Sequence, residues 1–333
     1  MTRPLRVFIN GFGRIGRTIA RQVLCHHAPG TIEIVGMNDI APLQTCAYLL
    51  RYDSVYGGFP LPVETAPHGL VIGGRPIPVT QVADLRLLDL GHVDVLLECT
   101  GKAVTRPFAE AGLTAGAARV LISGPSPVAD QTIVIGANEQ DLGDVRIVSN
   151  ASCTTNAIAP LLRALDQRLG IERAHVTTIH CYTGSQPTVD QANGSPERSR
   201  AAAVSMVPTT TSAAEQITHV LPAFGGRLTV AALRVPCLSV SAIDAVIQLG
   251  HAPEAPGPDV LRETFHGSAM IGLCDDPCVS SDFRARPEPL VIALPETRTI
   301  GPRQLRLLGW YDNEWAFSAR MLELAVQMQR RRT

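Results

Sequence analysis

The chain has 333 residues, of which 45% are hydrophobic and 18% are charged, and its net charge is −1. This length exceeds what one hydrophobic core usually organises, so two domains are expected. The near-neutral charge gives no reason to expect nucleic acid or an anionic membrane surface as a partner. No run of about 18 uninterrupted apolar residues occurs, so no transmembrane helix is predicted.

The first predicted elements are a strand, a glycine turn and a helix. Residues 7–9 form a short apolar run, and Gly11, Gly13 and Gly16 follow with the spacing G-x-G-x-x-G. Apolar residues after them recur at helical spacing. Such glycines let the backbone approach a pyrophosphate, which the helix N-terminus then favours. The motif alone is weak, and its context has to support it.

The second predicted strand, residues 32–39, ends in Asp39, which lies 23 residues beyond Gly16. An acid near this distance binds the adenosine ribose hydroxyls in dinucleotide-binding domains. The sequence therefore predicts a Rossmann-type domain. The alternative is a doubly wound domain that binds no dinucleotide.

Further apolar strands are predicted over residues 93–101, 119–126 and 145–150. They end in small or polar residues, among them Thr100, Gly101 and Ser123. Ligands of open parallel sheets lie beyond the carboxyl ends of the strands. We therefore expect the cofactor at these positions.

Cys153 follows the last of these strands and precedes an amphipathic pattern over residues 154–169. A free cysteine is most often a small buried hydrophobe. A position at a helix N-terminus instead lowers the pKa of a thiol and favours a nucleophilic thiolate. His180 ends the predicted strand 174–180 and is the candidate partner of the thiol.

The eight cysteines are scattered along the chain, which fits reduced thiols in the cytoplasm better than a disulfide framework. Cys274 and Cys278 form a C-x-x-x-C pair, but no second Cys or His pair lies at zinc spacing. No metal site is therefore predicted.

Six segments, NGFGRIGR, SNASCTTN, TTIHCYTG, VPTTTSAA, LRVP and WYDNEWAFS, resemble in order and spacing the phosphorylating glyceraldehyde-3-phosphate dehydrogenase family. The resemblance covers essentially the whole chain. It implies an α/β fold, with a Rossmann-type dinucleotide-binding domain over 1–152 and an α+β catalytic domain over 153–315. It also implies that a C-terminal helix over 316–333 returns to the first domain, and that the protein forms a homotetramer.

The resemblance implies covalent catalysis on a phosphorylated aldehyde and inorganic phosphate, with hydride transfer to NAD. Cys153 would add to the aldehyde and form a thiohemiacetal, then a thioester that phosphate attacks. His180 would raise the thiolate fraction, take the hydroxyl proton and hold the developing oxyanion.

The same resemblance implies the contact residues. Those for the substrate phosphate and the attacking phosphate are Ser152, Thr154, Thr183, Arg198, Thr211, Ser212 and Arg234. Those for the pyrophosphate turn are Gly11, Phe12, Gly13, Arg14 and Ile15. Asp39 would bind the ribose, and Asn313 would orient the nicotinamide carboxamide.

Several residues depart from the family pattern. Ser185 stands in place of an aspartate, Glu197 in place of an arginine, and Ser212 in place of a glycine. Gln191–Ala192 replaces a leucine–proline pair, which relaxes one hindrance to NADP, so NADP stays possible beside NAD. The alternatives are an erythrose-4-phosphate dehydrogenase, a specialised paralogue and a non-catalytic redox-sensing protein.

Overall fold

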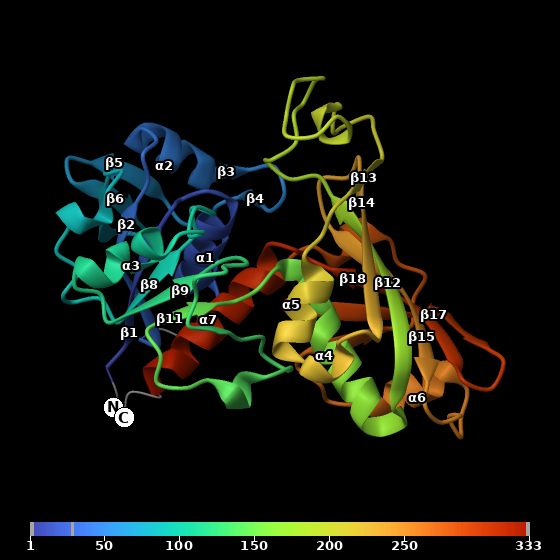
Figure 1. The fold of residues 1–333 in the computed structure, drawn as a ribbon. Coiled ribbons are helices and arrows are strands. Elements are labelled where there is room, and N and C mark those ends of the chain that lie inside the picture. Colours follow the sequence, from blue (N-terminus) through green and yellow to red (C-terminus); the bar gives the residue numbers. More distant parts are fainter. Residues whose placement is uncertain (1–2, 28–29, 331–333) are drawn as a thin grey trace. The chain divides into compact units, whose positions relative to one another are not determined.

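The computed structural model describes residues 3–27 and 30–330, which group into two compact units (Figure 1). The first unit contains the described residues among 1–133, 139–152 and 317–333, and the second contains 134–138 and 153–316. The α/β fold class expected from the sequence is confirmed: one unit has a parallel Rossmann-like sheet and the other a mostly antiparallel sheet.

The first unit is built on a nine-stranded sheet in the order β10-β11-β9-β8-β1-β2-β7-β6-β5. Pairing is parallel from β10 through β7 and antiparallel for β6 and β5. The strands are β1 (Leu5–Asn10), β2 (Ile32–Asn38), β5 (Val63–Ala66), β6 (Gly69–Ile72), β7 (Arg75–Thr80), β8 (Val95–Glu98), β9 (Arg119–Ile122), β10 (Gln131–Thr132) and β11 (Ile147–Ser149). Strands β2, β8, β9 and β11 end earlier than the sequence analysis predicted, because the last residues of the predicted strands lie in turns.

The turn between β1 and helix α1 (Arg14–Cys25) requires glycine for two reasons. Gly11 has a φ of +92°, and a Cβ there would lie 2.8 Å from the backbone of Cys99. A Cβ on Gly16 would lie within 2.1 Å of the Gly11 carbonyl oxygen. The glycines thus allow the helix to pack directly against the end of the sheet.

The other helices of the first unit are α2 (Leu43–Arg51) and α3 (Arg106–Thr114), and β3 (Tyr52–Asp53) pairs with β4 (Gly57–Gly58). Helix α7 (Trp315–Arg330) begins in the second unit, and its residues from 317 onward group with the first. The predicted C-terminal helix extends to residue 333, and residues 331–333 lie outside the described residues.

The second unit is built on a seven-stranded sheet in the order β13-β14-β12-β15-β18-β17-β16. Its pairs are antiparallel, except that β12 runs parallel to β14 and β16 runs parallel to β17. The strands are β12 (Ile171–Cys181), β13 (Val207–Thr209), β14 (Leu228–Val235), β15 (Ser241–Leu249), β16 (Ile271–Cys274), β17 (Leu290–Ile300) and β18 (Gln304–Tyr311).

Helices α4 (Cys153–Leu169) and α5 (Ala213–Val220) lie side by side against this sheet (Figure 1), and α6 (Gly257–Phe265) contacts β16 and β17. Residues 154–162 of α4 are buried without a break, as expected for a helix covered on several sides. Among the described residues, no helix is both long and apolar enough to cross a membrane.

Helix α4 and strand β12 form a return that brings their distant ends together. The helix has 17 residues and so spans about 25 Å. Gly170, with a φ of +65°, turns the chain into β12, whose residues up to His180 span about 30 Å. Since the two lengths nearly match, the first residue of α4 and the end of β12 meet at the same edge of the unit.

Candidate active site

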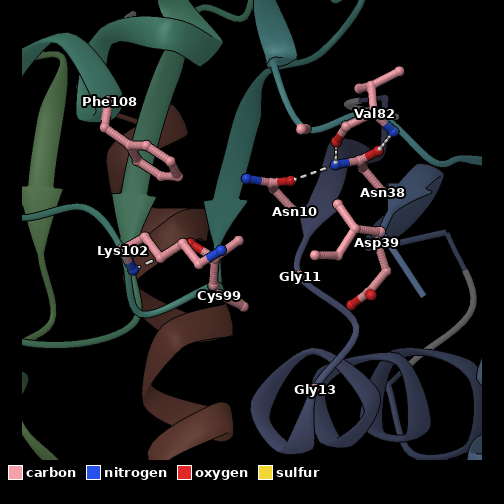
Figure 2. Close-up of a pocket in the computed structure, with 12 residues that line it drawn as sticks. Asn10, Gly11, Gly13, Asn38, Asp39, Val82, Cys99, Lys102 and Phe108 are labelled. Atoms are coloured by element: carbon pink, nitrogen blue, oxygen red, sulfur yellow. Dashed lines mark hydrogen bonds between the residues drawn. The ribbon is translucent and has the colours of Figure 1, made fainter.

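A pocket of about 280 Å³ lies in the first unit at the carboxyl ends of β1, β2 and β8 (Figure 2). Its lining includes four residues predicted from the sequence, Gly11, Gly13, Asp39 and Thr100. This is the edge at which doubly wound sheets bind nucleotides. A Cβ on Gly13 would meet no atom within 4 Å, so the turn leaves free space beside its backbone.

The carboxylate of Asp39 is fixed by the glycine turn. Its Oδ2 accepts a hydrogen bond of 2.6 Å from the backbone N–H of Phe12, and its Oδ1 accepts one of 2.8 Å from Ala41. Figure 2 shows this carboxylate directed toward the turn that carries Gly11 and Gly13. An ordered acid beside an open glycine turn fits the ribose and pyrophosphate of a dinucleotide.

A buried polar network supports the pocket, and the sequence analysis missed it. The Asn38 amide donates to Asn10 Oδ1 at 2.8 Å and to the Val82 carbonyl at 3.0 Å. The amide of Asn10 in turn donates to Glu98 at 2.5 Å, and Thr100 donates to the same carboxylate. Burial raises the pKa of Glu98. The sequence signal that could have revealed this network is the acidic residue Glu98, which lies inside the apolar run before Thr100.

The other predicted cofactor residues do not line this pocket. Phe12 is buried, and the guanidinium of Arg14 pairs with Asp53 at 2.5 Å. Ser123 directly follows β9, and its N–H donates to the Glu98 carbonyl at 2.9 Å. Of three further predicted residues, Ile15 lies in the first turn of α1, Gly101 follows β8, and Asn313 lies in the second unit.

The second unit brings Cys153 and His180 together, with Sγ and Nε2 3.5 Å apart. The α4–β12 return described above accounts for this contact. Cys153 is the first residue of α4, as the sequence analysis expected. His180 is 5% exposed and pairs in register with Arg234 of the parallel strand β14. The sequence analysis did not foresee that Arg234 would contact His180.

Arg234 contacts the side of His180 that faces away from the thiol. Its Nη1 lies 2.5 Å from Nδ1 of His180 and donates a 2.8 Å hydrogen bond to the Cys181 carbonyl. Burial, followed by the positive charge of Arg234, lowers the pKa of His180 to about 4. His180 is therefore neutral at pH 7.

The expectation of a lowered thiol pKa is wrong for this structure. Burial raises the pKa of Cys153, while the charge of Arg234 and hydrogen bonds from Thr154 act against the increase. The helix N-terminus was a local argument, whereas the desolvation comes from the tertiary fold. Cys153 therefore starts as a thiol, and a neutral His180 lies in contact with it.

A chain of hydroxyl groups lies under this pair. The Tyr311 hydroxyl lies 3.0 Å from Oγ1 of Thr154 and 2.7 Å from Oγ1 of Thr178, and its ring meets the His180 ring edge-on at 6.0 Å. Burial raises the pKa of Tyr311. Thr178 and His180 share a face of β12 because they are two residues apart. Apart from Thr154, the sequence analysis assigned none of these hydroxyls to the site.

The two arginines predicted to bind anions, Arg198 and Arg234, both lie in the second unit. Arg234 and Arg198 form no ion pair within the described part of the chain, whereas nearby Arg200 pairs with Asp190 at 2.9 Å. Nε of Arg198 donates a 2.7 Å hydrogen bond to Thr209, which lies on β13 beside β14. Unpaired, partly buried arginines favour anions.

Three residues that depart from the family pattern, Ser185, Glu197 and Ser212, form hydrogen bonds with hydroxyl or amide groups. The hydroxyls of Thr183 and Ser185 lie 3.0 Å apart, and Glu197 accepts a 2.6 Å hydrogen bond from Ser195. Oγ1 of Thr211 accepts from the Ala213 N–H at 3.1 Å, and Ser212 accepts from Gln216 at the start of α5. One further predicted phosphate contact, Ser152, immediately precedes Cys153.

Sγ of Cys274 and Sγ of Cys278 lie 3.6 Å apart. Within residues 3–27 and 30–330, no group of three or more His, Cys, Asp or Glu side chains could hold a metal ion.

Comparison with known proteins places both units in one family. Residues 5–106 match the NAD binding domain of glyceraldehyde 3-phosphate dehydrogenase, and residues 152–313 match its C-terminal domain. A glyceraldehyde-3-phosphate dehydrogenase of Xanthobacter flavus is 43% identical over 97% of this chain and 98% of its own.

Similar values hold for proteins of the same name from two other bacteria. The one from Cereibacter sphaeroides is 42% identical over 98% of this chain and 99% of its own. The one from Pseudomonas aeruginosa is 41% identical over 97% and 98%. These matches confirm the resemblance seen in the motifs, and the chain belongs to the glyceraldehyde-3-phosphate dehydrogenase family.

Proposed function

We propose that this chain catalyses the phosphorylating oxidation of glyceraldehyde 3-phosphate with NAD, and that Cys153 is the nucleophile. The 3.5 Å contact between Cys153 and His180 carries the assignment of residues. As the sulfur adds to the aldehyde carbon, Nε2 of His180 takes the proton of the thiol. It then passes this proton to the carbonyl oxygen, which becomes the hydroxyl of a thiohemiacetal, and so neutralises the charge that develops there.

In the oxidation step His180 takes the hydroxyl proton of the thiohemiacetal. NAD, when bound, accepts the hydride. Cys153 is left as a thioester, which inorganic phosphate attacks at the carbonyl carbon. The carbon–sulfur bond then breaks, releasing the acyl phosphate and the Cys153 thiolate. The thioester thus conserves the free energy of oxidation for phosphate capture.

Both the substrate phosphate and the attacking phosphate are anions that need cationic partners. We propose Arg234 and Arg198 for these roles, with Thr183 and Thr211 as hydrogen-bond donors. These roles for the two arginines are supported by the fact that neither guanidinium forms an ion pair within the described residues. Ser152, Thr154 and Ser212 complete the proposed set of phosphate contacts.

The cofactor pocket supports NAD more than NADP. The fixed carboxylate of Asp39 can accept hydrogen bonds from ribose hydroxyls, and it would repel a 2′-phosphate. Gln191 and Ala192 are exposed and present no bulky apolar side chain. We therefore propose a modest preference for NAD rather than an exclusive one.

A homotetramer in the cytoplasm is the proposed state of the protein. The segment from Thr183 to Met206 exposes three large apolar side chains, Val189, Val204 and Met206, each at least 70% exposed. A neighbouring subunit would cover them. All eight cysteines are free, which fits a reducing compartment. Light scattering of the purified protein tests the assembly.

One steady-state experiment tests the function. The purified protein is assayed with glyceraldehyde 3-phosphate and erythrose 4-phosphate, with NAD and NADP, and with or without inorganic phosphate. We expect the highest kcat/KM with the triose phosphate and NAD, and turnover that requires phosphate. A higher kcat/KM with erythrose 4-phosphate would favour the tetrose enzyme. A protein without turnover in any combination would favour the redox-sensing alternative.

A further inference from the structure

Cys181 is a second buried thiol at the site, and the proposed mechanism does not use it. It is the last residue of β12 and is 2% exposed. Its carbonyl accepts the hydrogen bond from Arg234, while its side chain is directed to a different residue. Sγ lies 3.1 Å from Oδ1 of Asn313, a side chain that is 8% exposed.

Ser241 joins the same contact. Its hydroxyl lies 3.3 Å from Oδ1 of Asn313 and 3.5 Å from Sγ of Cys181, and it accepts a 3.1 Å hydrogen bond from the Cys181 N–H. The strand register explains the meeting, because Ser241 begins β15 and pairs with Tyr311, two residues before Asn313. Two buried side chains, those of Cys181 and Ser241, therefore converge at the amide oxygen of Asn313.

The donors and acceptors of this cluster favour one orientation of the Asn313 amide. Burial raises the pKa of Cys181 to about 12, so its side chain is an S–H donor at neutral pH. With Oδ1 facing inward, the S–H and the Ser241 O–H both reach a carbonyl acceptor. A flipped amide would direct its N–H₂ at a sulfur, which is a weak acceptor, and would remove the carbonyl acceptor from both the thiol and the Ser241 hydroxyl.

We propose that Cys181 is a positioning residue for the reaction: together with Ser241, it holds the side-chain amide of Asn313 in the orientation that contacts the cofactor carboxamide. The inference rests on the proposed function, in which Asn313 makes that contact. Because Cys181 directly follows His180, two adjacent residues of β12 then act in the reaction. His180 is the base, and Cys181 supports the amide of Asn313 that contacts the cofactor.

The test uses the full-length protein and four variants, Cys181→Val, Cys181→Ser, Asn313→Ala and the double variant of Cys181→Val with Asn313→Ala. Valine fills the space of the thiol without a donor, whereas serine keeps one. We expect C181V to raise the KM for NAD about three- to ten-fold, the value of one hydrogen bond, and C181S to return it to within about two-fold of wild type. The KM for the aldehyde should change less.

The double variant separates positioning from a general structural role. If Cys181 acts through Asn313, C181V should add little to the KM for NAD in the N313A background. Effects that multiply in the double variant would overturn the proposal, as would an unchanged KM in C181V. If C181V does not fold, Cys181→Ala replaces it in the same comparison with the same expectations.

Two results distinguish a failure of this inference from a failure of the proposed function. An N313A variant with an unchanged KM for NAD would refute the contact between Asn313 and the cofactor, and with it this inference. A raised KM in N313A with a wild-type C181V would refute the inference alone. Cys25→Val, at the end of α1, removes another partly buried thiol and serves as the matched control.

Discussion

Nη1 of Arg234 lies 2.5 Å from Nδ1 of His180, so two residues that β14 and β12 pair in register also meet through their side chains. The same Nδ1 also lies 2.7 Å from the carbonyl oxygen of Cys181, so the imidazole, the guanidinium and this carbonyl meet at one place. Nε2, the other nitrogen of the ring, lies 3.5 Å from Sγ of Cys153. It is therefore the ring nitrogen that can exchange a proton with the sulfur or with a substrate oxygen bound there.

Arg234→Gln tests this relationship directly. A nearby positive charge disfavours the imidazolium, so its removal should raise the pKa of His180 from about 4 toward the ordinary value of 6.5. The increase should be incomplete, since burial, the larger cause, remains. An NMR titration of the His180 ring measures it. Arg198→Gln is the control: its guanidinium contacts Thr209 and not His180, so the pKa should stay unchanged.

Bound inorganic phosphate should raise the pKa of His180, as the Arg234→Gln substitution does. An anion bound at Arg234 offsets its positive charge and so makes the imidazolium easier to form. We expect phosphate to raise the pKa of His180 in the wild-type protein and to have no such effect in R234Q. Chloride at equal ionic strength is the control for screening. An equal shift in both proteins would mean that the phosphate does not bind at Arg234.

Cys153→Ser should abolish dehydrogenase turnover and leave the dissociation constant for NAD nearly unchanged. A hydroxyl is a far poorer nucleophile than a thiol at neutral pH. Turnover and calorimetric binding of NAD together measure the two effects. Substantial residual oxidation by C153S would exclude Cys153 as the nucleophile. Cys46→Ser, which changes a buried thiol of α2 in the first unit, is the matched control for turnover.

The pH dependence of alkylation tests the electrostatics of the thiol. Because burial raises the pKa of Cys153 above its ordinary value of 9.0, the thiolate fraction should keep rising with pH through neutrality. The rate of iodoacetamide reaction at Cys153, followed by peptide mass spectrometry without NAD, should increase in parallel. A rate that is already constant from pH 6 upward would show an ion pair instead of a neutral pair.

Local patterns predicted the elements that local chemistry determines. The glycine turn, Asp39 and the helix that begins at Cys153 follow from spacing and chain order. The distance of 27 residues between Cys153 and His180 also has a local cause, because one helix and one strand of similar length return the chain to its starting edge. Such features depend on contiguous sequence and need no knowledge of sheet order.

The features that depend on strand register could not be predicted in this way. His180 meets Arg234 only because β12 and β14 pair in parallel, although the two residues are 54 positions apart in the sequence. Asn313 meets Cys181 through the pairing of β15 with β18. The raised pKa of Cys153 has the same origin, since desolvation arises from elements that are remote in sequence.

Cofactor preference should be decided mainly by Asp39. We expect the kcat/KM for NAD to exceed that for NADP by a modest factor, and Asp39→Asn to narrow the ratio by removing a charge that repels a 2′-phosphate. Steady-state kinetics with both cofactors measure the ratio. A wild-type protein that prefers NADP would show that the segment with Gln191 and Ala192 outweighs the acid.

The last prediction concerns Ser185, which stands where the family commonly has an aspartate. Its hydroxyl lies 3.0 Å from Oγ1 of Thr183, so the hydrogen bond to that threonine is present, but the negative charge is not. A neutral partner orients Thr183 less firmly than a carboxylate would, by about 1–3 kcal/mol. We therefore expect a KM for glyceraldehyde 3-phosphate that is roughly ten- to a hundred-fold above that of a member with the aspartate, with kcat less affected.

Ser185→Asp should recover part of this affinity, and Ser185→Ala should lose more of it, because alanine removes the contact with Thr183 altogether. Ser195→Ala, on the same exposed segment, removes a hydroxyl bonded to Glu197 instead and is the matched control. The KM for the triose phosphate, measured for all three variants, shows whether their affinities follow this order. Two results together would show that the site accommodates the longer substrate. S185D would leave the KM for glyceraldehyde 3-phosphate unchanged, because restoring the charge brings no gain in affinity for the triose phosphate, and erythrose 4-phosphate would give the higher kcat/KM.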